Sequence, residues 1–235
     1  MNDASQLRLL SEGEISVRGR VVDSSNQALV VDVRLDGAHA LACYKAEAGE
    51  RPLWDFPEGL WRREVAAYEL DRLLGVGLVP PTVAREDAPL GPGSLQWWIE
   101  EATDDHYFTL RHRDDFDAVA RTLAAFDVVA NNADRKAGHV LFDGDRYWAI
   151  DHGLCFHRDD KLRTVLWEFA GEPVELHLLE RIAHVADGHT GALAKWLSPD
   201  ELAMTQWRAA ALVDSGVYPH PDEEGSWRPY PWPLI

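Results

Sequence analysis

The stretch NNADRKAGHVLFDGDRYWAIDHG, residues 131–153, decides the fold. Within it, two short apolar runs, 139–142 and 147–150, are joined by the turn sequence DGDR, which predicts a β-hairpin. Directly opposed residues of antiparallel strands have Cβ atoms about 5 Å apart. With the turn at 143–146, Phe142 opposes Tyr147 and His139 opposes Ile150, so His139 and Asp151 should lie together at the open end of the hairpin.

Charged side chains gather at that end. Asp134 lies on the short loop that enters the hairpin, followed directly by Arg135 and Lys136. Carboxylates are preferred ligands of Mg²⁺ and Mn²⁺, and cations neutralise phosphate oxygens. The pattern predicts a pocket for a divalent ion and a polyphosphate. The alternative interpretation is a polar turn with a solvated cluster of salt bridges.

Periodicity divides the rest of the chain. Residues 15–45 alternate as three strands, residues 59–74 form a helix, and 95–99 form another strand. After residue 101 the spacing is helical, with helices predicted at 116–130, at 174–186 and from the capping box SPDE at 198–201. The expected architecture is α+β with two lobes, a β-rich N-lobe over 1–100 and a helical C-lobe over 101–235.

The chain from Val217 onward carries five of the thirteen prolines together with Trp227 and Trp232. Proline removes a backbone donor and fixes φ, so this composition does not favour a helix or a central strand. We expect the segment to lie extended over the surface of the C-terminal half.

Two further charges interrupt apolar patterns. Lys45 ends the third strand on the face of Leu41 and Cys43, and Glu64 has only apolar or aromatic neighbours at helical spacing. Taken singly, each is explained by a side chain that reaches solvent. Taken together, they predict a buried ion pair, which is what many kinases use to hold the α- and β-phosphates of ATP.

Composition excludes several classes of partner. The 235 residues carry 23 basic and 40 acidic side chains, a formal charge of −17, which disfavours nucleic acid and anionic membranes. There is no apolar run of the roughly 20 residues needed to span a bilayer, and the first ten residues lack a signal-peptide pattern. Two cysteines, Cys43 and Cys155, fit a reducing compartment. We expect a cytoplasmic monomer.

The motifs NADR at 132–135 and AIDHGL at 149–154 resemble the catalytic loop and metal-binding motif of phosphatidylinositol 3-/4-kinase-like enzymes. They are most similar to type II phosphatidylinositol 4-kinases and bacterial HipA-type protein kinases. The stretches 44–45, 49–57 and 63–68 resemble an actinobacterial branch called phosphatidylinositol-kinase-related.

This resemblance implies a two-lobed protein-kinase-like fold that binds ATP with Mg²⁺ or Mn²⁺. For the nucleotide it implies that Lys45 and Glu64 form a phosphate clamp. It implies that Ser24, Ser25 and Asn26 form a loop that covers the phosphates. It further implies that Glu100 to Thr103, including Ala102, form the hinge that contacts adenine. For the chemistry it implies that Asp134 positions the acceptor hydroxyl and that Asp151 and His139 bind the metal ion. It implies that Arg135 and Lys136 neutralise phosphate charge.

Two departures from the family pattern keep alternatives open. His139 stands where the superfamily places an Asn, five residues after Asp134, and an imidazole suits Mn²⁺ or Zn²⁺ better than Mg²⁺. Residues 158–161, RDDK, lack the basic character with which lipid kinases read an inositol headgroup. We therefore predict transfer of the γ-phosphate to a protein or small-molecule hydroxyl. The alternatives are a nucleotide-binding pseudokinase that acts as sensor or scaffold, and an enzyme that transfers AMP.

Overall fold

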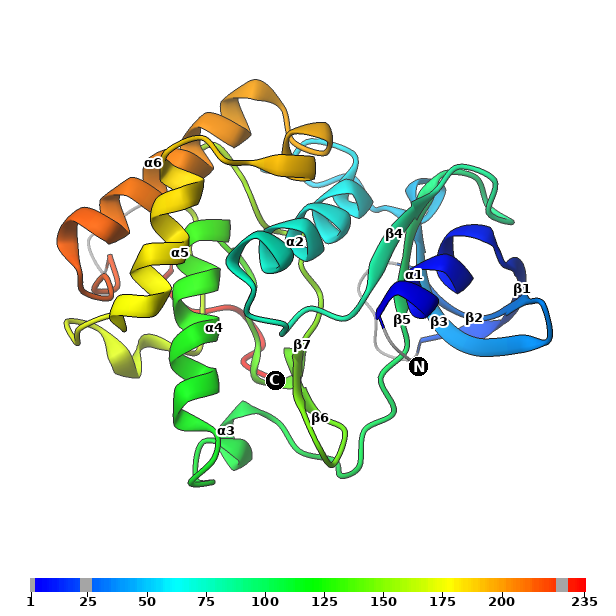
Figure 1. The fold of residues 1–235 in the computed structure, drawn as a ribbon, viewed down its shortest axis with the longest axis horizontal. Coiled ribbons are helices and arrows are strands. Elements are labelled where there is room, and N and C mark those ends of the chain that lie inside the picture. The colour runs from blue at the N-terminus through cyan, green and yellow to red at the C-terminus, as the bar shows by residue number, and fades with distance from the viewer. Residues whose placement is uncertain (1–2, 22–26, 223–227) are drawn as a thin grey trace.

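An antiparallel sheet forms one side of the molecule and a group of helices forms the other (Figure 1). The computed structural model describes residues 3–21, 27–222 and 228–235. The sheet has the strand order β1-β2-β3-β5-β4, with bounds β1 (Glu14–Arg20), β2 (Ala28–Leu35), β3 (Ala38–Ala46), β4 (Thr82–Arg85) and β5 (Gly93–Trp97). The predicted strands are confirmed, and their alternating apolar residues form a core of their own under the sheet.

The sequence analysis missed one helix, α1 (Asp3–Glu12). Its two buried residues, Leu9 and Leu10, belong to the sheet core. Only these adjacent leucines are fully buried, so the segment lacks the repeating apolar stripe by which an amphipathic helix is recognised.

The helical side contains α2 (Leu60–Leu74), α3 (Tyr107–Leu110), α4 (Asp117–Ala130), α5 (Leu176–Ala186) and α6 (Pro199–Ser215). A two-stranded hairpin, β6 (Val140–Phe142) and β7 (Tyr147–Ala149), lies beside them, and short 3₁₀ turns occupy Glu47–Gly49, Ala137–His139, Trp167–Phe169 and Gly191–Lys195. The capping box predicted at Ser198 and Glu201 is present. None of the helices in the described part of the chain is long and apolar enough to cross a membrane.

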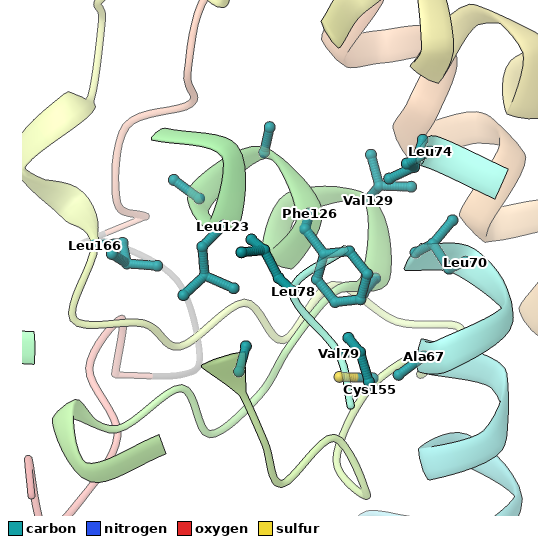
Figure 2. Close-up of a cluster of buried hydrophobic side chains, with 14 of the residues drawn as sticks. Ala67, Leu70, Leu74, Leu78, Val79, Leu123, Phe126, Val129, Cys155 and Leu166 are labelled. Atoms are coloured by element: carbon teal, nitrogen blue, oxygen red, sulfur yellow. The ribbon is translucent and has the colours of Figure 1, made fainter. Parts of the chain in front are cut away.

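Helix α2 joins the two sides. It touches β4 and β5 of the sheet and also α4 and α5, and Figure 1 shows it between them. Leu70 and Leu74 of α2 face Phe126 and Val129 of α4 in the large helical core (Figure 2). The α+β architecture in two parts is thus confirmed. The division at residue 100 stays a prediction, since α2 packs its apolar face on the helical side.

The carboxylate of Asp71 fixes the path of the chain after the end of α2. The helix ends at Gly75, whose φ of 60° is left-handed, and the chain then turns toward β4. The buried Asp71 side chain accepts backbone N–H groups from Gly77 at 3.1 Å, Leu78 at 2.7 Å and Val79 at 3.0 Å. These donors would otherwise be buried without partners, which is costly.

We predict that Asp71→Ala lowers the free energy of unfolding by about 3 kcal/mol, because it leaves several buried N–H groups unsatisfied. The matched control is Asp117→Ala, whose carboxylate is 67% exposed and pairs with Arg121 on the helix surface. The control is expected to cost less than about 1 kcal/mol. Urea denaturation followed by circular dichroism measures both, and equal losses would contradict the role of Asp71.

Candidate active site

A lysine, a glutamate and an aspartate from three segments meet between the sheet and the helices. The Lys45 ammonium on β3 donates to Glu64 Oε1 on α2 and lies 2.8 Å from Asp151 Oδ1. The Glu64 side chain is 2% exposed, and its Oε2 accepts the His152 backbone N–H at 3.1 Å. Glu64 therefore ties β3 to residues 151–152, a link that sequence reasoning did not foresee.

Electrostatics keep Lys45 and Asp151 charged. Burial opposes the charge on Lys45, but the Asp151 and Glu64 carboxylates hold the pKa of its ammonium above the usual range. Burial likewise opposes ionisation of Asp151, and Lys45 followed by His139 holds the pKa of that carboxyl well below its usual range. Opposite charges within a few ångströms favour the charged forms in this way.

The hairpin has the predicted register. Phe142 pairs with Tyr147, and the Ile150 N–H donates to the His139 carbonyl at 3.0 Å. His139 Nε2 consequently lies 3.4 Å from Asp151 Oδ2. Burial lowers the pKa of His139 to about 4, so the ring is neutral at pH 7, and its Nδ1 accepts the Lys136 N–H at 3.4 Å.

Asp134 and Lys136 belong to the charged loop, residues 131–139. The Lys136 ammonium lies 3.2 Å from Asp134 Oδ2, and the Asp134 N–H donates to Asn132 Oδ1 at 3.0 Å. Burial raises the pKa of Asp134. Asp134 shares a narrow cavity of about 40 Å³ with Lys45 and Asp151, together with Glu64.

Arg135 does not face this cavity, and the prediction that it neutralises phosphate charge is wrong. Its side chain is fully buried and makes a two-pronged pair with Asp127 of α4, at 2.9 Å and 3.0 Å. Its Nη1 donates to the Ile150 carbonyl at 2.9 Å, and its Nη2 lies 2.8 Å from His152 Nε2. The sequence did contain a sign of this buried pair. Asp127 follows the core residue Leu123 by four positions, so the carboxylate lies on the buried face of the helix and needs a cation.

A second cavity, of about 370 Å³, opens between the sheet and the hairpin. It is lined on one side by Lys45, His139 and Asp151 and on the other by Trp97, Trp98, Ile99 and Glu101. The predicted hinge residues Glu100 and Ala102 do not line it, and the Ala102 N–H already donates to the Phe142 carbonyl at 3.0 Å. Of the predicted hinge, Glu100 to Thr103, the residue that lines this cavity is Glu101, and Ile99 just before the predicted range lines it as well. The predicted Ser24, Ser25 and Asn26 lie outside the described residues.

The segment 50–57 entered the sequence analysis only through a family resemblance, and the structure shows what it contacts. Glu50 accepts the N–H groups of Gly59 at 2.9 Å and Trp61 at 2.7 Å, which caps the start of α2. Phe56 forms a small apolar cluster with Leu60 and with Ala133 of the charged loop. The segment thus connects the helix that carries Glu64 to the loop that carries Asp134, and only tertiary packing reveals it.

The chain is 38% identical to "Protein Rv2133c" of Mycobacterium tuberculosis over 270 aligned residues, covering 97% of this chain and 94% of that protein. The chain belongs to the family of this mycobacterial protein. No protein family model matches.

Solved structures show the fold of this family. A Golgi casein kinase with Mn/ADP bound has a TM-score of 0.63 at 15% identity, covering 99% of this chain and 80% of that one. A structure of hydra Fam20 with sugar has a TM-score of 0.53 at 14% identity, covering 89% and 86%. The fold is a two-lobed kinase-like fold, as predicted. The finer assignment to phosphatidylinositol 3-/4-kinase-like enzymes stays a prediction.

The donor set suits a divalent ion that shares its coordination with phosphate. Across residues 3–21, 27–222 and 228–235, no three histidine, cysteine or acidic side chains stand close enough to enclose a metal by themselves. Mg²⁺ in nucleotide sites takes only one or two protein carboxylates and fills its other positions with water and phosphate oxygens. Asp151, with a side chain 45% exposed, fits that pattern, whereas the imidazole of His139 beside it suits Mn²⁺ better than Mg²⁺.

We predict that Arg135→Met lowers the free energy of unfolding by at least about 3 kcal/mol, because it leaves the Asp127 carboxylate buried without its cation. The control is the neighbouring Lys136→Met, whose partly exposed pair with Asp134 is expected to contribute less than about 1 kcal/mol. Thermal and urea unfolding compare the two. A loss for Arg135→Met no greater than for Lys136→Met would show that the buried pair does not hold the loop.

Proposed function

We propose that the chain is an ATP-dependent phosphotransferase that uses Mg²⁺ or Mn²⁺ and acts on a hydroxyl of a protein or a small molecule. One observation carries the proposal. Lys45 is held by Glu64 and Asp151 at the edge of a cavity that also contains Asp134. A cation, two carboxylates of unlike environment and an adjoining cavity are the parts that phosphoryl transfer requires.

The phosphate end of the nucleotide would lie against Lys45. Glu64 fixes the direction of the lysine side chain, since its own carboxylate is buried and also accepts the His152 N–H. Asp151 and His139 would hold the ion, which supplies positive charge to the β- and γ-phosphate oxygens when it is bound. The Mn/ADP bound to the Golgi casein kinase supports a divalent ion and an adenine nucleotide as the bound groups.

The base of the nucleotide would enter the cavity of about 370 Å³, whose volume is in the range of small-ligand sites. Trp97 and Trp98 supply aromatic surface there, and the backbone groups of Ile99 and Glu101 would bond to the base. The base would then lie on the sheet side and the phosphates toward the charged loop.

Asp134 would orient the acceptor hydroxyl and receive its proton. Burial raises the pKa of this carboxyl, and Lys136 at 3.2 Å opposes that rise. Lys136 would also neutralise charge that develops on the transferred group. As in other kinases, catalysis would consist mainly of positioning and charge stabilisation.

The acceptor is proposed to be a protein or small-molecule hydroxyl, because the formal charge of −17 disfavours an anionic lipid surface. His139 supports a second candidate, a nucleotide-binding pseudokinase. Its imidazole occupies the position at which the wider superfamily has an Asn ligand, and it contacts Asp151 directly.

Calorimetric titration of ATP and ADP with Mg²⁺, with Mn²⁺ and with EDTA tests the proposal. We expect metal-dependent binding that weakens at least about tenfold in Asp151→Asn, because the variant removes the charge facing the ion. Asp145→Asn, an exposed change in the hairpin turn, is the matched control and should leave the affinity unchanged. Absence of nucleotide binding by the unaltered protein under every condition would refute the proposal.

Asp134→Asn separates the two candidates. In an enzyme it should keep nucleotide affinity and slow phosphate release from ATP by about 10²- to 10⁴-fold, since it removes the base and not the clamp. A pseudokinase would bind ATP and show no turnover that this variant could lower. Intact mass of modified acceptors distinguishes phosphate from AMP, which is much heavier.

A further inference from the structure

Residues 228–235, here called the strap, are hydrogen-bonded to the segment that supports the charged loop. The Pro229 carbonyl accepts the Thr164 N–H at 3.1 Å and the Trp167 indole N–H at 2.8 Å. Thr164 in turn forms a parallel bridge with Arg135, through backbone bonds of 3.0 Å and 3.2 Å on either side of it. The strap is thus the outer of three hydrogen-bonded segments, of which the innermost is the loop itself.

A second anchor lies closer to the site. The Leu234 carbonyl accepts the N–H of the fully buried Ala137 at 2.8 Å. Ala137 begins the 3₁₀ turn Ala137–His139, which carries His139 into the nucleotide cavity. Ile235 lies against the same turn, since a Cβ built on Gly138 would come within 3.8 Å of its Cγ2.

The strap is held in place mainly by its backbone, because several of its large side chains are exposed. Trp232 is 81% exposed, and Ile235 is 60% exposed. The contacts that define its path are backbone carbonyls aimed at Thr164, Trp167 and Ala137. A segment that only completed the core would bury its apolar side chains instead. The strap instead supplies backbone carbonyl acceptors to N–H donors of the segments that support the site.

We propose that the strap is a positioning element of the nucleotide and metal site, acting through the hydrogen bond from Ala137 to Leu234. That bond fixes where the turn 137–139 begins, and so it fixes Lys136 before the turn and His139 at its end. Loss of the Leu234 carbonyl removes this restraint from the Ala137 N–H, so the start of the turn can shift. The expected effect of the strap on nucleotide affinity rests on the proposed function. The expected effect of the strap on the turn 137–139 does not.

The first experiment deletes residues 233–235, which removes the Leu234 acceptor and keeps the Pro229 anchor. We expect the affinity for ADP with Mn²⁺ to fall about fivefold to tenfold, the worth of one hydrogen bond, with unchanged stoichiometry. Tyr230→Ala is the matched control, because Tyr230 lies between the two anchors with a side chain 47% exposed. The control should bind as the unaltered protein does.

A second variant reaches the same bond from the other side. Ala137→Pro removes the donor, and the extended ψ of 162° at Lys136 accepts a following proline. It should weaken ADP binding as the deletion does, and the combination should weaken binding no further, since both remove one interaction. Additive losses would mean that the strap acts by another route and would overturn the proposal.

Hydrogen exchange supplies a readout that needs no bound nucleotide. The amides of Ala137 and His139 should exchange faster in the deletion, and that of His139 faster in Ala137→Pro. Faster exchange in a protein whose unaltered form binds no ADP would support the strap and refute the proposed function. Unchanged exchange, or a lower melting temperature with unchanged ADP affinity, would overturn the strap as a positioning element.

Discussion

The buried guanidinium of Arg135 is the interaction on which the site depends. It pairs with Asp127 of α4, donates to the Ile150 carbonyl at the end of the hairpin and contacts His152. A buried charge is tolerated only when its partners are well placed and complete. The helix, the charged loop and the hairpin are therefore held in one arrangement, and Asp134 and Asp151 are held with them.

Around that centre, α2 couples the two sides of the molecule. One face of the helix packs on α4 in the large core, while Glu64 reaches Lys45 on the sheet and the His152 backbone. Glu50 caps its first turn and Asp71 closes its last. A helix tied at both ends therefore links Lys45 on the sheet to residues 151–152 beside the charged loop.

Much of this organisation follows from short-range rules. The hairpin register comes from a two-residue period and a turn of fixed length, which is why His139 was predicted opposite Ile150 and beside Asp151. The strands, the long helices and the capping box at Ser198 have the same local origin. The pairing of Lys45 with Glu64 was predicted because a charge among apolar neighbours needs a partner.

What the sequence by itself determined is thus the set of elements, the hairpin and the polar residues that do not fit apolar patterns. Only the tertiary structure decided which way each charge points. Arg135 turns inward because Asp127 lies beneath it, and the residues at Ile99 and Glu101 reach the cavity while Ala102 bonds to Phe142. Periodicity reports which residues are buried within an element, whereas the partner across an interface depends on how distant segments pack.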